Sequence, residues 1–397
     1  MTRSVVAAQG APWPSVKTWA LRLVEFGAIQ VMVQFLTAAA GFIILRALSK
    51  PEYSLFAIGN SIQSTCNLLA DVGIGLGVNS IGGRVWNDPE RFGQLLNTAF
   101  ALRRRFILFS LGIYLPTAAW MFRQNGAGLL LTIGLCLAIA VSVIPLLGVT
   151  AWGASTKLHG EFRRIQKLDL GTALMRCVLV GVLTLTRLNV ILAVLVGTVG
   201  NWVQMFYLRN WAREKIVVDA PTNPEDRREI LKISLKSLPN TIFFCFQGQI
   251  TLLVLTFLGN TSGIADITAL GRLAVLFTII SVTFTNVLAP HFMRCQDPTR
   301  LSRLYCLLVG GAGCVLTPLV GLAWLFPDPL LWFLGDKYAS LGRECGWVLA
   351  AACIGQISGV MWGLNASKAW IRLQAPFFIP IILTVLVITA LLVNLRQ

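Results

Sequence analysis

One apolar stretch near the start of the chain carries five polar side chains: Asn60, Gln63, Ser64, Asn67 and Asp71. At about 100° per residue of an α-helix, these side chains fall within about 100° of arc and form one stripe. The amides offer hydrogen bonds, and the carboxylate offers a titratable group. Such a stripe is costly against hydrocarbon, so we expect it to face protein or water.

Three further apolar stretches are polar along one side. Equivalent helices in the two halves of the chain therefore carry polar stripes, which is typical of helices that line a wet cavity. Interhelical hydrogen bonding is the alternative explanation for the same residues. The residues are Gln30, Gln34 and Thr37 at 26–47, Asn240, Gln247 and Thr251 around 241–259, and Thr268, Arg272, Thr283 and Asn286 at 264–289.

Two arginines lie deep inside apolar stretches. Arg272 is about eight residues inside its stretch, where its side chain reaches the membrane surface only with difficulty. A guanidinium held there presents a fork suited to phosphate or carboxylate. The alternative is a structural ion pair between Arg272 and Asp71 or Asp266. Arg176 lies similarly deep, and Asp169 on the same helix face is too distant along the helix to pair with it directly.

Long apolar stretches separated by short loops must position these groups. Hydrophobic residues make up 56% of the 397 residues and charged residues 13%, and the mean hydropathy is +0.72. A bilayer core takes about 20 apolar residues per helix. The sequence therefore excludes a water-soluble protein and predicts an all-α polytopic membrane protein. The eleven predicted spans are 26–47, 55–80, 105–122, 127–150, 166–186, 188–208, 241–259, 264–289, 304–326, 346–364 and 374–395.

The net charge of +16 is explained by basic loops. Of the 33 Lys and Arg residues, 24 lie in one set of alternate loops and 7 in the other. Positively charged loops stay in the cytoplasm, so we expect a cytoplasmic N-terminus and no nucleic-acid partner. The run of arginines at 103–105 is expected to anchor the topology and to meet anionic membrane lipids.

The other reactive residue types point to neither a metal site nor catalysis. The nine cysteines lie mostly in apolar stretches without a CxxC spacing, so we expect buried thiols and no disulfide framework. His159 and His291 offer no metal cluster. No Walker loop, nucleophile elbow or paired-carboxylate motif is visible, so the sequence predicts neither an enzyme nor a bound cofactor.

A charged stretch divides the chain into two halves. Residues 209–240 carry Pro221, Pro224 and a dense mixture of charges, and we interpret them as a cytoplasmic linker. The other predicted units are a cytoplasmic tail at 1–24, a six-helix bundle at 25–208 and a bundle of five to six helices at 241–397. An even number of spans before the linker gives both halves the same orientation. We therefore expect two pseudo-symmetric bundles around a central cavity.

A short repeat supports this division. The element Asp88-Pro89-Glu90-Arg91 follows the second span, and Asp297-Pro298-Thr299-Arg300 follows the eighth. Asp is a favoured N-cap, and Pro is favoured at the first helical position. We expect each element to begin a short surface helix at the equivalent place in its half.

Several segments also carry a family resemblance. Residues 41–57 (GFIILRALSKPEYSLFA) and 69–77 (LADVGIGLG) resemble the junction of the first two helices and the end of the second helix in bacterial polysaccharide transporters. Those proteins belong to the multidrug/oligosaccharidyl-lipid/polysaccharide flippase superfamily. The matching segments of the second half, which resemble their seventh and eighth helices, are 247–250 (QGQI), 257–259 (FLG), 269–273 (ALGRL) and 288–290 (LAP).

The resemblance implies two six-helix bundles around a central cavity, and alternating access. It also implies translocation of an undecaprenyl-diphosphate-linked oligosaccharide across the bacterial inner membrane, for O-antigen, capsule or exopolysaccharide assembly. In that family, cationic residues of the cavity receive the diphosphate, and Arg272 and Arg176 match that role here. The chain departs from the family in its eleven predicted spans, where twelve or more are usual.

We therefore expect a flippase of surface polysaccharide biosynthesis. The two arginines would hold the diphosphate, and Asn60, Gln63, Asn67 and Gln247 would offer hydrogen bonds to sugar. The membrane potential or an H⁺ or Na⁺ gradient would supply energy, with Asp71 as the titratable candidate. Three alternatives stay open: a multidrug exporter of the same superfamily, a polytopic glycan polymerase or ligase, and a membrane scaffold.

Overall fold

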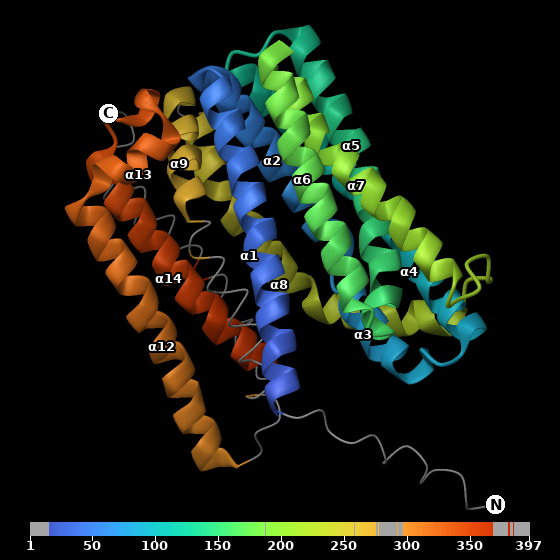
Figure 1. The fold of residues 1–397 in the computed structure, drawn as a ribbon. Coiled ribbons are helices and arrows are strands. Elements are labelled where there is room, and N and C mark those ends of the chain that lie inside the picture. The colour runs from blue at the N-terminus through green and yellow to red at the C-terminus, as the bar shows by residue number, and fades with distance from the viewer. Residues whose placement is uncertain are drawn as a thin grey trace, which may run out of the picture.

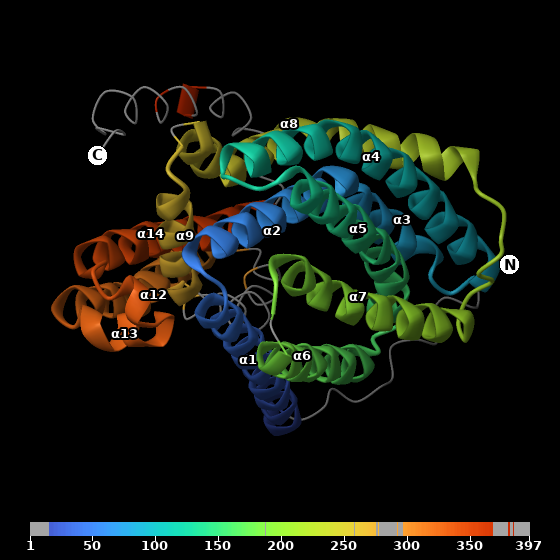
Figure 2. The same ribbon diagram turned by 90° about the horizontal axis from the view of Figure 1, so that it is seen from above.

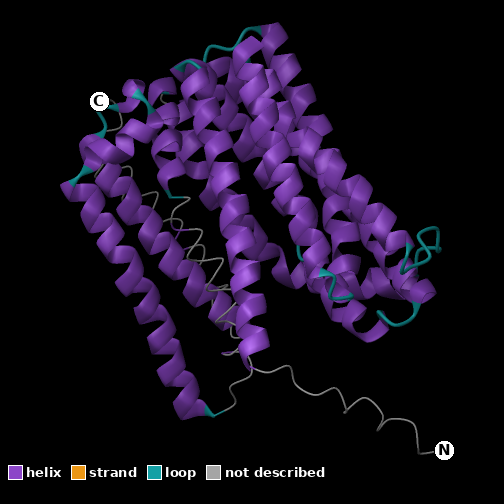
Figure 3. Ribbon diagram, viewed as in Figure 1, coloured by secondary structure: helices purple, strands orange, loops and turns teal. Residues whose placement is uncertain are grey.

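The computed structural model describes residues 16–186, 188–257, 259–274 and 297–367, together with residues 277, 292, 380, 381 and 384. Apart from those single residues, the predicted span 374–395 and the later part of the span 264–289 lie outside the described residues. In the described part every regular element is helical (Figure 3), which confirms the all-α fold class.

The helices follow the apolar stretches of the sequence closely. In the first half they are α1 (Val16–Ala47), α2 (Lys50–Asp71), α3 (Ile74–Val85), α4 (Pro89–Gln124), α5 (Leu129–Leu158), α6 (Phe162–Thr186) and α7 (Val190–Arg213). In the second half they are α8 (Pro224–Phe257), α9 (Thr261–Leu273), α12 (Pro298–Leu325), α13 (Pro327–Leu334), the 3₁₀ turn η2 (Asp336–Tyr338) and α14 (Gly342–Ser367).

The helices form two groups that meet at one end of the molecule. Figure 1 shows α1 to α7 on one side and α9, α12, α13 and α14 on the other. Seen from above in Figure 2, α1, α2, α5, α7 and α6 follow one another round a ring, and the second group lies beside it. Among the described residues, seven helices are long and apolar enough to cross a membrane. The protein is thus a multi-pass membrane protein.

The predicted span 55–80 is not one helix. α2 ends at Asp71 and α3 begins at Ile74, because the backbone turns at Val72 (φ 27°) and Gly73 (φ 75°). Glycine adopts a positive φ readily because it has no Cβ. At position 73 a Cβ would also lie 2.0 Å from the hydroxyl of Ser237 on α8. The sequence pattern missed this break because the apolar residues continue through it.

The two Asp-Pro elements begin helices, as predicted. Asp88 caps α4 and Asp297 caps α12, and each side-chain oxygen accepts a backbone N–H of the first turn. The helices are not short, however: α4 has 36 residues and α12 has 28. α4 therefore includes the arginines at 103–105, which the sequence analysis placed in a loop.

The stretch 209–240 is helical except at 214–223. α7 runs to Arg213 and α8 begins at Pro224, so the charged residues mostly extend two helices. The connecting segment is fastened to α4, where the amide of Asn97 donates to the carbonyls of Val218 (2.6 Å) and Ala220 (2.7 Å). The start of α8 also belongs to the surface of the first group.

Two buried apolar clusters hold the described helices together. The larger one joins both groups of helices, since Ile44 and Phe56 of the first half share it with Leu270 and Leu334 of the second. The smaller one joins α3, α4 and α5 to Ile230 of α8. The two groups are therefore packed tightly at the end that holds the α1–α2 turn, which is predicted to be extracytoplasmic.

Candidate functional site

Arg272 reaches from α9 of the second half into the space between α1 and α2 of the first. Its Nε donates a hydrogen bond to the hydroxyl of Tyr53, 3.1 Å away, and its guanidinium carbon lies 5.9 Å from the ring centroid of Phe56. On α1, a Cβ added to Gly41 would lie 2.8 Å from Nη1 of Arg272. The absence of a side chain at Gly41 thus makes room for the guanidinium.

The polar stripe of α2 begins at this arginine. Tyr53 and Phe56 lie on the same helix face as Asn60, Gln63 and Asn67, since all five fall within about 100° of arc. The three amide side chains are half-buried, and the described part of the chain provides no hydrogen-bond partner for them. The structure thus places Arg272 at one end of a row of free amides.

Arg176 approaches the same region from α6. Its guanidinium carbon is 3.9 Å from the position that a Cβ of Gly197 on α7 would take. Arg272 is close enough for its positive charge to act on Arg176. The Nε of Arg176 is buried and has no hydrogen-bond partner. Arg176 of the first half and Arg272 of the second half therefore lie within electrostatic range of each other.

The two carboxylates that the sequence offered as partners for Arg272 are paired with other cations. Asp266 forms an ion pair with Lys50, at 3.0 Å between Nζ and Oδ1. Asp71 forms an ion pair with Arg103 of α4 and also accepts the backbone N–H of Gly75 at 3.3 Å. The structural ion pair considered for Arg272 is therefore not formed with either carboxylate.

Arg103 is a site residue that the sequence analysis missed. It was assigned to a loop, but α4 continues through it and only 4% of its surface is exposed. Asp71, which the sequence placed well inside a span, instead ends α2 with 38% of its side chain exposed. The Asp71–Arg103 pair marks the far end of the α2 stripe, about 27 Å from Tyr53 along the helix.

The structure does not bring Gln247 to the α2 stripe. Gln247 is exposed, whereas Gln249 is buried and its Nε2 donates to the hydroxyls of Ser61 (2.9 Å) and Thr65 (2.6 Å) of α2. Residues two apart differ by about 200° around a helix, so the two glutamines face nearly opposite ways. Helical spacing from the buried Thr256 and Cys245 would have pointed to Gln249 as the packed residue.

The α1–α2 turn is fastened to the second half by cations. Lys337 Nζ donates to the carbonyls of Arg46 (3.1 Å) and Leu48 (2.8 Å). Arg46 Nε in turn donates to the carbonyl of Phe333 at 3.2 Å. Together with the Lys50–Asp266 pair, these contacts join the two groups of helices at the end that is predicted to be extracytoplasmic.

Tyr338 lies beneath these contacts. Its ring is buried 5.1 Å below the ammonium group of Lys50, and its hydroxyl has no hydrogen-bond partner. Burial, with the nearby Tyr53 and Asp266, raises the pKa of the Tyr338 hydroxyl, so it stays neutral at physiological pH. The contact with Lys50 is thus a cation–π interaction with a neutral ring.

This arrangement of helices is found in transporters of known structure. An inward-facing multidrug resistance MATE family transporter of the MOP superfamily matches with a TM-score of 0.66 at 16% identity, over 87% of this chain and 84% of that chain. This chain has the MOP transporter fold. The predicted resemblance to the superfamily is confirmed at the level of fold.

Other solved structures agree. A MOP superfamily transporter from Pyrococcus furiosus, whose reversed binding-pocket polarity suggests a different function, matches with a TM-score of 0.59 at 15% identity, over 90% of this chain and 95% of that chain. A eukaryotic MATE transporter matches with a TM-score of 0.52 at 12% identity, over 95% and 97%. No protein-family model and no curated protein matches the sequence.

Proposed function

We propose that this protein is an inner-membrane flippase that translocates undecaprenyl-diphosphate-linked oligosaccharide for surface polysaccharide biosynthesis. The proposal rests on Arg272 and Arg176, two arginines within electrostatic range of each other at the level of the apolar helices. Two guanidinium groups close together and away from bulk water repel one another unless an anion lies between them. The described residues offer no carboxylate partner to either, so a diphosphate is a fitting counter-charge.

The α2 stripe supports the glycan part of the proposal. Asn60, Gln63 and Asn67 follow Arg272 along one helix face, and their amides are free to exchange hydrogen bonds with sugar hydroxyls. A sugar chain attached to a diphosphate at Arg272 would run along this row. The prenyl tail would stay in lipid, where each buried methylene group is favourable.

Alternating access would open the end that is predicted to be extracytoplasmic. The contacts of Lys50 with Asp266 and of Lys337 with the α1–α2 turn join the two halves there. These polar contacts are few and partly exposed, so each is weak enough to break in a transport cycle. Rocking of one half against the other would break them together.

Asp71 is our candidate for coupling to an ion gradient. Its partner Arg103 is buried, so protonation of Asp71 would leave a buried cation without its counter-charge. That change would favour a conformation in which Arg103 is better solvated. Loss of this one counter-charge would thereby act on the helix that carries the glycan stripe.

Multidrug export is the second candidate, because a multidrug resistance transporter has the same fold. A cationic drug would prefer carboxylates and aromatic rings, whereas the site here gathers two arginines. The Pyrococcus furiosus transporter is an example of this fold with reversed pocket polarity. A polymerase or ligase would need a large outward loop, but the segment 327–345 is largely taken up by α13 and η2.

The test is complementation of a bacterial strain that lacks its own polysaccharide flippase. The wild-type chain should restore surface glycan, and Arg272→Ala should not, at equal protein levels in the membrane. Arg213→Ala, which changes an exposed arginine at the end of α7, is the matched control and should restore glycan fully. Normal surface glycan from the Arg272 variant would refute the assigned role.

A further inference from the structure

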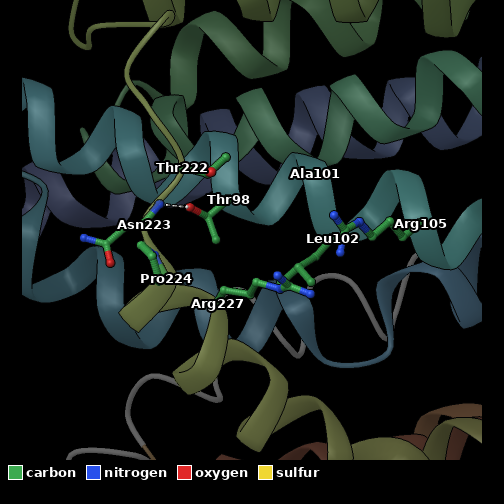
Figure 4. A pocket seen from close by; sticks show the side chains of 8 residues that line it. All are labelled: Thr98, Ala101, Leu102, Arg105, Thr222, Asn223, Pro224 and Arg227. Carbon is green, nitrogen blue, oxygen red and sulfur yellow. Dashed lines mark hydrogen bonds between the residues drawn. The ribbon is translucent and has the colours of Figure 1, made fainter.

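Two arginines line a small cavity on the face that is predicted to be cytoplasmic. The cavity has a volume of about 130 Å³ and lies between α4 and the start of α8. Figure 4 shows Arg105 extending from α4 and Arg227 from α8 toward the same space. The lining residues are Thr98, Ala101, Leu102, Arg105, Thr222, Asn223, Pro224 and Arg227.

Two acidic residues near the cavity, Asp226 and Glu229, pair with other arginines. Asp226 is buried and binds Arg91 through both carboxylate oxygens, with Nη2 and Oδ1 2.7 Å apart. Glu229 pairs with Arg84. Within the described ranges, neither of the two cavity arginines has a carboxylate partner. This surface thus pairs Arg84 and Arg91 with carboxylates and leaves Arg105 and Arg227 without one among the described residues.

The frame of the cavity is rigid. The hydroxyl of Thr98 on α4 accepts the backbone N–H of Asn223 at 2.8 Å, as Figure 4 shows. Asn223 in turn accepts the N–H of Glu225 through its side chain at 2.8 Å and so caps the start of α8. These bonds fix the first turn of α8 against α4. The backbone positions from which the exposed side chains of Arg105 and Arg227 extend are therefore fixed relative to one another.

We propose that this cavity binds one phosphate group, presented either by an anionic lipid headgroup of the cytoplasmic leaflet or by phosphate free in solution. A guanidinium group donates two parallel hydrogen bonds that match the spacing of phosphate oxygens. Two guanidinium groups together would supply both positive charge and directed hydrogen bonds to one phosphate. The cavity is suited to a single phosphate group. The site lies apart from Arg272 and Arg176, so the inference is independent of the transported substrate.

A phosphate in this cavity would bridge the two halves of the chain. Arg105 belongs to the first half, and Arg227 lies in the first turn of the second. The anion would replace a repulsion between α4 and α8 with two attractions. It would therefore strengthen the docking of the start of α8 onto α4.

Retention of lipid by the purified full-length protein tests the site. Native mass spectrometry would compare phosphatidylglycerol with phosphatidylcholine on the wild type and on Arg105→Gln/Arg227→Gln. A second variant, Ala101→Leu, fills the cavity and keeps both charges. The control, Arg104→Gln/Arg228→Gln, removes two arginines that are exposed like Arg105 and Arg227 but do not line the cavity.

We expect phosphatidylglycerol affinity to fall about tenfold in the cavity arginine variant and in Ala101→Leu, and to change little in the control. Equal loss in the control, or full retention by Ala101→Leu, would overturn the site in favour of diffuse attraction by a basic surface. Added inorganic phosphate distinguishes the sources. If inorganic phosphate displaces phosphatidylglycerol, the cavity also binds phosphate free in solution. If inorganic phosphate does not displace it, the cavity binds the lipid headgroup alone.

Discussion

Arg272 on α9 donates a hydrogen bond to the hydroxyl of Tyr53 on α2, across 219 positions of the sequence. This bond ties the second half of the chain to the helix that carries the glycan stripe. Gly41 on α1 leaves the space into which the guanidinium fits. The proposed diphosphate site therefore depends on three helices from two halves.

Tyr53→Phe removes the hydrogen bond and keeps the ring. A hydrogen bond to a charged group contributes about 2 kcal/mol, so we expect Arg272 to lose its fixed orientation and export to fall severalfold. Surface glycan in a complemented strain measures the effect. Tyr207→Phe, at an exposed tyrosine of α7, should leave export unchanged. Unchanged export by the Tyr53 variant would show that the hydroxyl does not position the arginine.

Gly41→Ala places a methyl group where the tip of Arg272 now lies. The arginine side chain is flexible, so we expect the protein to remain as stable as the wild type while the guanidinium shifts and export falls. Thermal unfolding in detergent and surface glycan would be measured side by side. Gly112→Ala is the control, because a Cβ at Gly112 meets no neighbour within 4 Å. A large loss of stability with Gly41→Ala would instead indicate a packing role.

Asp71→Asn leaves the guanidinium of Arg103 buried without a counter-charge. We expect a loss of about 2 kcal/mol in the free energy of unfolding, less than for a fully buried pair because Asp71 is 38% exposed. Asp71→Leu with Arg103→Leu should recover stability, because no charge is left unpaired. If Asp71 couples transport to an ion gradient, this double variant will still fail to export glycan. Recovery of both properties would make the pair purely structural.

Asp226→Ala should be far more damaging than Glu229→Ala. The side chain of Asp226 is 2% exposed and its loss leaves Arg91 unpaired, so we expect destabilisation by about 3 kcal/mol. Glu229 and Arg84 are 44% and 60% exposed, and we expect less than about 1 kcal/mol there. The comparison uses thermal unfolding in one detergent. Similar shifts for both variants would mean that the Asp226 pair does not secure α8 to α4.

A covalent cross-link between positions 50 and 266 should block the proposed transport cycle. The variant Lys50→Cys/Asp266→Cys replaces the ion pair with two thiols, in a background where the exposed Cys306 and Cys314 are serine. We expect a short bifunctional thiol reagent to block export in vesicles, and each single cysteine to be insensitive to it. Continued transport by the cross-linked double variant would argue that this end of the molecule does not open.

Several features of the protein follow from the sequence by itself. The length of an apolar segment determines whether it can span a bilayer, and this is a local property of the sequence. The apolar segments therefore predicted a multi-pass membrane protein. The caps at Asp88 and Asp297 are also local, because a side chain bonds to the next turn of its own helix. Helical periodicity in the same way determines which residues of α2 share a face.

Only the tertiary structure decided which polar groups meet. Periodicity does not say how far a helix is rotated against its neighbour, so it could not choose between Gln247 and Gln249. Nor could it assign Arg103 rather than Arg272 to Asp71. A charged side chain can pair only with a group that lies near it, and nearness across helices is set by the packing of the whole chain.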